Sequence, residues 1–176
     1  IQRDINQAIE TSSGDYVVIT GNDIFVKPNW LESLIMPFNV YQDCGVSSLS
    51  AREGSGVTIG PPYPVNLIIE TVYAPLMMFE RKWRFDTAYP GMYGDSDLVM
   101  RIIASGKRAY MNCASPIFHF HGMASATILN PESTAHQRDV GLKLFKERWE
   151  YSPYLLAKLI MNGAIGGINW AKEYQV

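Results

Sequence analysis

Apolar residues recur at helical spacing over residues 1–11, so that one side of this segment is hydrophobic. The Ser-Ser-Gly sequence at 12–14 ends this predicted helix, and the apolar run YVVIT at 16–20 follows it. A short unbroken apolar run of this kind predicts a fully buried strand of a parallel sheet. The apolar face of the predicted helix consists of Ile1, Ile5, Ala8 and Ile9.

A second helical pattern begins after Pro28. Asn29 is the predicted N-cap, with Glu32 three residues later, as in a capping box. The sequence CGVSSL from Cys44 predicts a short strand, and the Gly-, Ser- and Pro-rich stretch 50–64 predicts a long loop. The buried stripe of this helix is predicted to be Trp30, Leu31, Leu34 and Ile35.

The later pattern continues to alternate between strands and helices. It predicts a strand over 72–79, a helix over 95–105 that ends at Gly106, and two short strands at 108–113 and 116–122. After Ser125 the apolar spacing is mostly helical. The predicted fold class is therefore α/β, with a domain of residues 1–125 and a helical extension, 126–176, packed on it. Leu98, Ile102 and Ile103 form the predicted buried face of the helix at 95–105, and Leu142, Phe145 and Trp149 that of the extension.

Composition narrows the functional classes. The 176 residues suffice for one domain with a sizeable core, and 15 Lys and Arg against 17 Asp and Glu leave a net charge of -2. This charge gives no footprint for nucleic acid. Cys44 and Cys113 are too far apart for a zinc ribbon and are predicted to be reduced thiols. The apolar stretch 154–168 is short, contains a lysine and is broken by glycines, so no bilayer-spanning segment is expected.

Three aspartates are candidates for chemistry. Asp23 follows the predicted strand at 16–20, where an open sheet binds ligands, although taken alone it is better explained by an Asx-turn before Pro28. Asp95 and Asp97 both begin a helix, where acidic residues commonly serve as caps. Arg101 lies four residues after Asp97, the spacing of a helical ion pair. We therefore assign Asp97 and Arg101 to structural support and leave Asp95 available for chemistry.

Two histidines alternate with phenylalanines in the sequence FHFH at 118–121. In a strand, His119 and His121 share one face, which would suit a divalent metal ion. Two histidines make an incomplete site, so oxygen ligands must come from elsewhere in the chain. His136 is given no role.

These residues together resemble a known family. The segment 6–35, NQAIETSSGDYVVITGNDIFVKPNWLESLI, is similar to the middle of inverting nucleotide-sugar glycosyltransferases with the GT-A fold, family 2-like. LMMFERK at 76–82 looks like the strand before that family's acceptor loop. GDSDLVMRIIASGKRAYMNCASPIFHFHG at 94–122 is similar to its Glu-Asp-x-Asp-Leu helix and its histidine-ended strand pair. The resemblance covers residues 6 to about 125.

The resemblance implies a role for each matching residue. Asp95 matches the catalytic base, which takes a proton from the acceptor hydroxyl. Asp23 and His119 match ligands of a divalent cation, Mn²⁺ or Mg²⁺, with His121 as an alternative or outer ligand. Independently of the resemblance, the aromatic residues Trp83 and Tyr93 are candidates for stacking on sugar rings, although aromatic residues in such loops pack against the core at least as often.

The chain also departs from the family pattern. Gly21 replaces the first acid of the Asp-x-Asp metal motif, and Gly94 replaces the acid that usually precedes the base. The first βα units of the Rossmann-like, mixed-sheet GT-A fold, which hold the nucleotide, are expected to be missing. An isolated chain of this kind is expected to self-associate and to transfer no sugar.

The expected partners are a nucleotide-sugar donor and a carbohydrate or glycolipid acceptor, in the cytoplasm or at the membrane surface. Two alternatives stay open. One is an inactive carbohydrate- or partner-binding remnant, consistent with the two glycines. The other is a metal-dependent hydrolase that uses Asp23, Asp95, His119 and His121.

Overall fold

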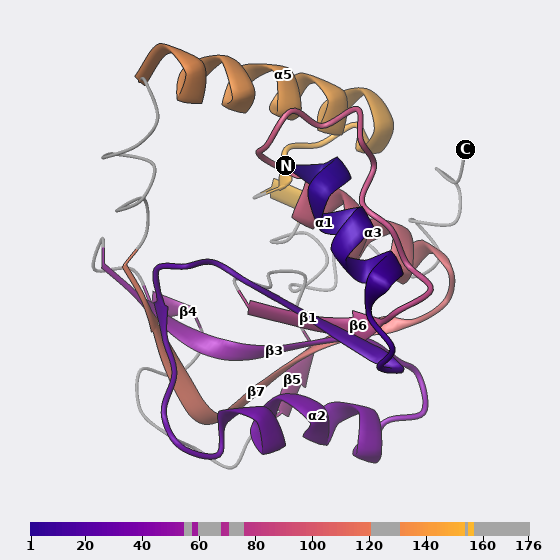
Figure 1. Ribbon diagram of the computed structural model, residues 1–176, viewed down its shortest axis with the longest axis vertical. Helices are drawn as coiled ribbons and strands as arrows, with labels where there is room; N and C mark the ends of the chain where they lie inside the picture. The colour runs from indigo at the N-terminus through magenta and orange to yellow at the C-terminus, as the bar shows by residue number, and fades with distance from the viewer. Residues whose placement is uncertain (55–57, 60–67, 71–75, 121–130, 154, 157–176) are drawn as a thin grey trace.

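The chain folds into a mixed β-sheet with helices on both faces, an α/β architecture compatible with a Rossmann-like fold (Figure 1). The computed structural model describes residues 1–54, 58–59, 68–70, 76–120, 131–153 and 155–156. The helices are α1 (Gln2–Thr11), α2 (Trp30–Val40), α3 (Gly94–Ala104) and α5 (Pro131–Trp149). The strands are β1 (Tyr16–Thr20), β2 (Ile24–Phe25), β3 (Cys44–Glu53), β4 (Thr58–Ile59), β5 (Ile68–Glu70), β6 (Leu76–Glu80) and β7 (Arg108–His119).

The sheet has the strand order β1-β6-β3-β7-β2, with β4 paired to β3 and β5 paired to β7. The central strands β3 and β7 are parallel, and the other pairs are antiparallel. A parallel pair needs a crossover, and the segment between β3 and β7 supplies it with β6 and α3.

Three strand predictions were wrong in detail. β1 is not a fully buried parallel strand: it pairs antiparallel with β6, and only Val17 is buried. β3 continues to Glu53, into the predicted loop. The two strands predicted around 108–122 are one continuous strand, β7, which the neighbouring β3 follows along most of its length. Each error has the same origin, because a strand's partner and direction are not encoded in its own residues. Residues 72–75 of the strand predicted over 72–79 lie outside the described residues.

Helix α2 covers one face of the sheet. Leu34 is fully buried there and packs against a cluster made by β3, β6 and β7: Leu49, Ala51, Leu76, Met78 and Ile117. The predicted stripe holds for Trp30, Leu34 and Ile35, but Leu31 is 45% exposed. The predicted capping box does not form, since Asn29 has a left-handed backbone (φ 63°) and its side chain makes no cap hydrogen bond.

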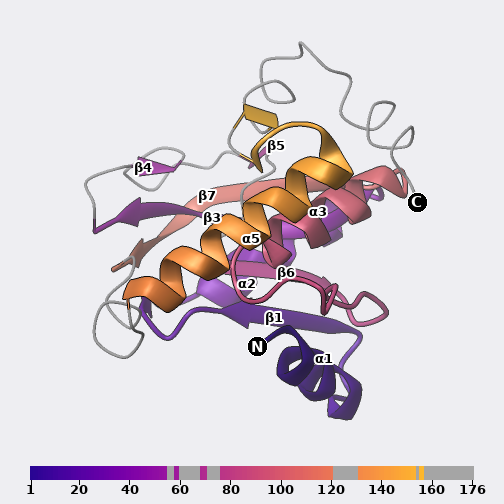
Figure 2. The ribbon, with the colours of Figure 1, turned by 90° about the horizontal axis from the view of Figure 1, so that it is seen from above.

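Helices α1, α3 and α5 cover the opposite face (Figures 1 and 2). Their main core residues are Ile9 of α1, Leu98, Ile102 and Ile103 of α3, and Phe145 and Trp149 of α5. The helical periodicity predicted all of these positions, whereas Ile1 and Ala8 are exposed. The predicted helix stop is present: Gly106 has a φ of 96°, which glycine adopts without strain. Both cysteines are buried free thiols, as predicted.

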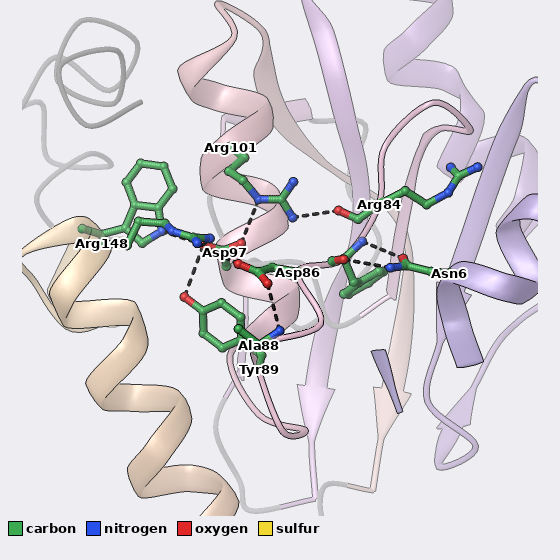
Figure 3. A network of polar contacts seen from close by, with 10 residues as sticks. Asn6, Arg84, Asp86, Ala88, Tyr89, Asp97, Arg101 and Arg148 are labelled. Atoms are coloured by element: carbon green, nitrogen blue, oxygen red, sulfur yellow. Dashed lines mark hydrogen bonds and ion pairs between the residues drawn. The ribbon is translucent and has the colours of Figure 1, made fainter. Parts of the chain in front are cut away.

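A buried carboxylate joins α3 to α5 (Figure 3). Asp97 has no exposed surface, and its Oδ1 accepts hydrogen bonds from Arg148 Nη1 at 2.8 Å and Trp149 Nε1 at 3.0 Å. The Tyr89 hydroxyl donates to the same oxygen at 3.2 Å. Arg101 Nε donates to Oδ2 at 2.8 Å, which is the ion pair expected from the helical spacing. Asp97 therefore acts through its buried pairing, not as a cap.

A second layer of polar contacts extends this network to the loop between β6 and α3. Arg148 Nη2 donates to Asp86 Oδ2 at 2.7 Å, and Arg101 Nη2 donates to the backbone carbonyl of Arg84 at 2.8 Å. Burial opposes ionisation of Asp86, but hydrogen bonds from the Ala88 N–H and from Arg148 outweigh it and lower the pKa of that carboxyl. The network thus contains two arginines and two aspartates, so its charges are balanced.

Self-association was predicted because the expected absence of the first βα units would expose an edge of the sheet, and it stays a prediction. Within the described residues β1 pairs on one side only, with β6, and it ends the strand order. The sequence of β1 contains no charged residue, so it lacks a common protection of edge strands against pairing with another chain.

We expect Asp97→Asn to lower the free energy of unfolding by about 3 kcal/mol, the lower end of the cost of breaking a buried ion pair. The substitution removes the negative charge that pairs with two guanidinium groups. It also places an amide N–H group opposite a hydrogen-bond donor. The lower end applies because the side chains of Arg101 and Arg148 keep 28% and 32% exposure. Urea unfolding measures the change. Asp139→Asn is the control: its ion pair with Arg138 is exposed and should change stability by about 0.5 kcal/mol or less. Equal effects of the two variants would contradict the role of Asp97.

Candidate functional site

Asp23 and His119 lie side by side at the end of the sheet. β2 pairs with β7 so that Ile24 is opposite His119, which places the preceding residue, Asp23, beside the histidine ring. His119 Nε2 lies 3.3 Å from Asp23 Oδ1, and each side chain is 16% exposed. The backbone holds the pair, since the N–H of Phe120 donates to the carbonyl of Asp23 at 2.9 Å. Two residues 96 positions apart in the sequence are therefore brought into contact by one strand pair.

The spacing of these two atoms fits ligands of one cation. Two ligands at right angles on Mg²⁺, with bonds of about 2.1 Å, lie about 3 Å apart. The 3.3 Å separation is close to that value, and a carboxylate oxygen with an imidazole nitrogen is a suitable pair. Within the described ranges, no group of three or more His, Cys, Asp or Glu side chains converges, and His121 lies outside those ranges.

Gly21 leaves space for the Asp23 carboxylate. A Cβ at position 21 would lie 2.6 Å from Asp23 Oδ1, closer than such atoms approach in folded proteins. An aspartate at this position, as in the Asp-x-Asp motif, would require the Asp23 side chain to move. The glycine is thus matched to the observed position of Asp23.

Asp95 lies in the first turn of α3 and lines a cavity of about 220 Å³. The residue is exposed on one side and surrounded by protein on the other. Desolvation raises the pKa of the Asp95 carboxyl above its ordinary value, although hydrogen bonds from the backbone N–H groups of Ser96 and Asp95 act in the opposite direction. Access of water on the exposed side limits how far the pKa rises.

The cavity extends from Asp95 to the end of β1, where Gly21 forms part of its wall. Gly21 also faces the Asp23 carboxylate, so this part of the cavity lies next to the Asp23–His119 pair. The remaining lining residues come from α1, β1, β6 and the loop before α3: Ile1, Gln2, Ile5, Ile19, Thr20, Met77, Phe85 and Gly91.

The expected sugar-contact residues lie elsewhere. Trp83 and Tyr93 are partly buried and pack against the core between the sheet and α3. Neither lines the cavity beside Asp95, whereas Phe85 does. Their role in sugar binding stays a prediction.

Sequence reasoning missed Gln2 and Arg148. Gln2 is 4% exposed although it is polar. A signal was present, because Gln2 lies three residues before Ile5 and seven before Ile9, on the buried face of α1. Arg148 carried no such signal, since its partners Asp86 and Asp97 lie 62 and 51 residues earlier.

No protein-family model matches this chain, and no curated protein sequence shows significant similarity to it. Within the described part of the chain, no helix has the length and apolarity needed to cross a membrane.

We expect Asp95 to titrate above about 3.9, the ordinary pKa of an aspartate. NMR of side-chain carboxyl carbons as a function of pH measures this. The folded state then binds the proton more tightly than the unfolded state. The contribution of Asp95 to stability should therefore be greatest below the ordinary pKa and should fall as the pH rises through the raised pKa of Asp95. Asp95→Asn should remove this fall. A midpoint at or below the ordinary value would show that Asp95 is not desolvated.

Proposed function

We propose that this chain forms the metal and acceptor side of an inverting, metal-assisted glycosyltransferase with a GT-A fold, and that Asp95 is its general base. The substrates are a nucleotide-sugar donor and an acceptor that carries a free hydroxyl. One observation carries the proposal: Asp95, with a raised pKa, lines a cavity that reaches Gly21, next to the Asp23–His119 pair. The family resemblance of residues 6 to about 125 agrees with these roles.

Inversion requires the base and the leaving group to lie on opposite sides of the reacting carbon. The acceptor oxygen forms a bond to the anomeric carbon while the bond from that carbon to the diphosphate breaks. The bonding electrons leave with the nucleoside diphosphate, and the proton of the acceptor hydroxyl passes to the Asp95 carboxylate. Asp95 lines the cavity and the Asp23–His119 pair lies next to Gly21, another lining residue, so the base and the cation ligands are separate groups close to one cavity, as this division of labour requires.

A raised pKa makes Asp95 a better proton acceptor. A base is most effective when its pKa approaches the operating pH, provided that it remains ionised. Desolvation in the cavity moves the pKa of Asp95 in that direction. Asp97, two residues later, is fully buried and held by four hydrogen bonds, so it cannot share this role.

Asp23 and His119 would hold the divalent cation. When bound, the cation would neutralise charge on the diphosphate group. Asp23 contributes a carboxylate oxygen and His119 an imidazole nitrogen at a spacing that fits adjacent ligands. The Gly21 backbone allows the Asp23 carboxylate to keep this position.

Asp95→Asn should lower sugar transfer by about 10²-fold or more, because it removes the base and keeps the shape. The assay uses the protein with any residues that precede Ile1 in its gene, a panel of nucleotide sugars and hydroxyl acceptors, and Mn²⁺. Asp139→Asn, an exposed position on α5, is the matched control and should retain full activity. Near-normal transfer by Asp95→Asn would remove the assignment.

The same assay separates the two alternatives. Metal-dependent turnover without any nucleotide sugar would identify a hydrolase. Carbohydrate binding without any turnover would identify an inactive remnant, for which the loss of acids at Gly21 and Gly94 would then be the cause.

Mn²⁺ should bind at Asp23 and His119. Its unpaired electrons should broaden NMR signals near these residues before those elsewhere in the chain. We expect His119→Ala to weaken Mn²⁺ binding by at least about tenfold. His136→Ala, which changes an exposed histidine of α5, should not weaken it. Equal Mn²⁺ affinity in the two variants would exclude His119 as a ligand.

A further inference from the structure

Gln2 is a buried polar residue beside Asp95. It begins α1, is 4% exposed, and lines the 220 Å³ cavity together with Asp95. Its Nε2 donates a hydrogen bond to the carbonyl of Gly91 at 3.1 Å, in the loop that leads into α3. This contact fixes which end of the amide is the nitrogen.

The other end of the amide is an acceptor without a donor. Gln2 Oε1 is buried and has no hydrogen-bond partner among the residues that the structure describes. Buried carbonyl oxygens are almost always hydrogen-bonded, because leaving one unpaired costs free energy. A residue that lines a cavity and whose side-chain oxygen is buried, held in one orientation and still unpaired indicates a missing donor.

Gly94 makes the position of Gln2 possible. A Cβ at position 94 would overlap Gln2 Nε2, and Gly94 is itself buried. Any residue with a side chain at this position, including the acid that the family resemblance leads one to expect, would displace the amide. The chain therefore has a glutamine amide from α1 where an acidic side chain would otherwise precede Asp95.

The cavity has the chemistry of a ligand that donates hydrogen bonds, as hydroxyl groups do. Gln2 Oε1 and the ionised Asp95 carboxylate both accept hydrogen bonds, so the ligand must donate them. The Thr20 hydroxyl donates to the backbone carbonyl of Gly21 at 3.1 Å, which leaves its oxygen as a further acceptor. Aliphatic and aromatic side chains form the remaining wall, and such surfaces pack against the C–H face of a sugar ring: Ile5, Ile19, Met77 and Phe85.

The size of the cavity limits the ligand. At about 30 Å³ per water molecule, 220 Å³ holds roughly seven waters. It is smaller than pockets for drug-sized ligands, which begin at about 300 Å³. A single sugar ring is the appropriate size.

We propose that Gln2 is an acceptor-binding residue: its Oε1 accepts a hydrogen bond from one hydroxyl of a monosaccharide unit, while a second hydroxyl of that unit faces Asp95. The identification of this sugar as the acceptor rests on the proposed transferase function. Gln2 thereby selects a sugar with two suitably spaced hydroxyls, and Gly94 is the residue that admits its amide.

The test uses methyl glycosides of common monosaccharides as probes, added singly to the protein and followed by methyl NMR of Ile5, Ile19 and Met77. At least one glycoside should shift these signals, together with the side-chain amide signal of Gln2. Gln2→Met, which keeps the shape and removes the acceptor, should weaken binding at least about fivefold. Gln7→Met, the same substitution at an exposed position of α1, is the control and should bind normally.

Three results would overturn the proposal: no glycoside shifts the cavity signals, the Gln2 amide signal does not move, or Gln2→Met binds as tightly as the wild type. The amide signal decides the matter in the wild-type protein even when Gln2→Met fails to fold. The transfer assay keeps the two proposals apart. Glycoside binding that depends on Gln2, without transfer, would reject the transferase and retain this site. Transfer that depends on Asp95, with an unchanged acceptor KM in Gln2→Met, would reject Gln2 and retain the transferase.

Discussion

The buried charge of Asp97 is the constraint on which this side of the molecule depends. A carboxylate with no contact with water must be compensated, and the compensation comes from three parts of the chain. Arg101 belongs to its own helix, Tyr89 to the preceding loop, and Arg148 to α5. Because all three segments meet at one carboxylate, the start of α3 is fixed relative to both α5 and the loop. The position of Asp95 follows from this anchoring.

Asp95 and Asp97 show how environment divides the roles of two similar residues. Successive positions on a helix are about 100° apart, so residues two apart face nearly opposite directions. Asp97 faces the core and is held by four donors, whereas Asp95 faces a cavity and keeps access to water. The first arrangement stabilises the fold through paired charge. The second raises the pKa of a carboxyl and leaves it able to receive a proton, at a cost in stability.

Two glycines shape the surroundings of this site by what they leave empty. Gly21 leaves room for the carboxylate of Asp23, and Gly94 leaves room for the amide of Gln2. In the family pattern that the sequence resembles, an acidic residue is expected at each of these two positions. In the folded chain each space is occupied by a polar group from another position. Close packing explains why these spaces are filled, since a void beside a polar group would lose packing contacts or admit water.

Local sequence determined the features that depend on near neighbours. The helical spacing of Asp97 and Arg101 predicted their pairing, and apolar periodicity predicted the buried faces of α3 and α5. The apolar run at 16–20 predicted a strand correctly but not its antiparallel partner, because apolar residues alone do not specify one. The α/β class was predictable, and so were Asp23 and His119 as candidates, whereas their contact depended on the pairing of β2 with β7. Gln2 and Gly94 meet across 92 positions of sequence, and only the tertiary structure decided that contact, because chain folding and not local preference brings such residues together.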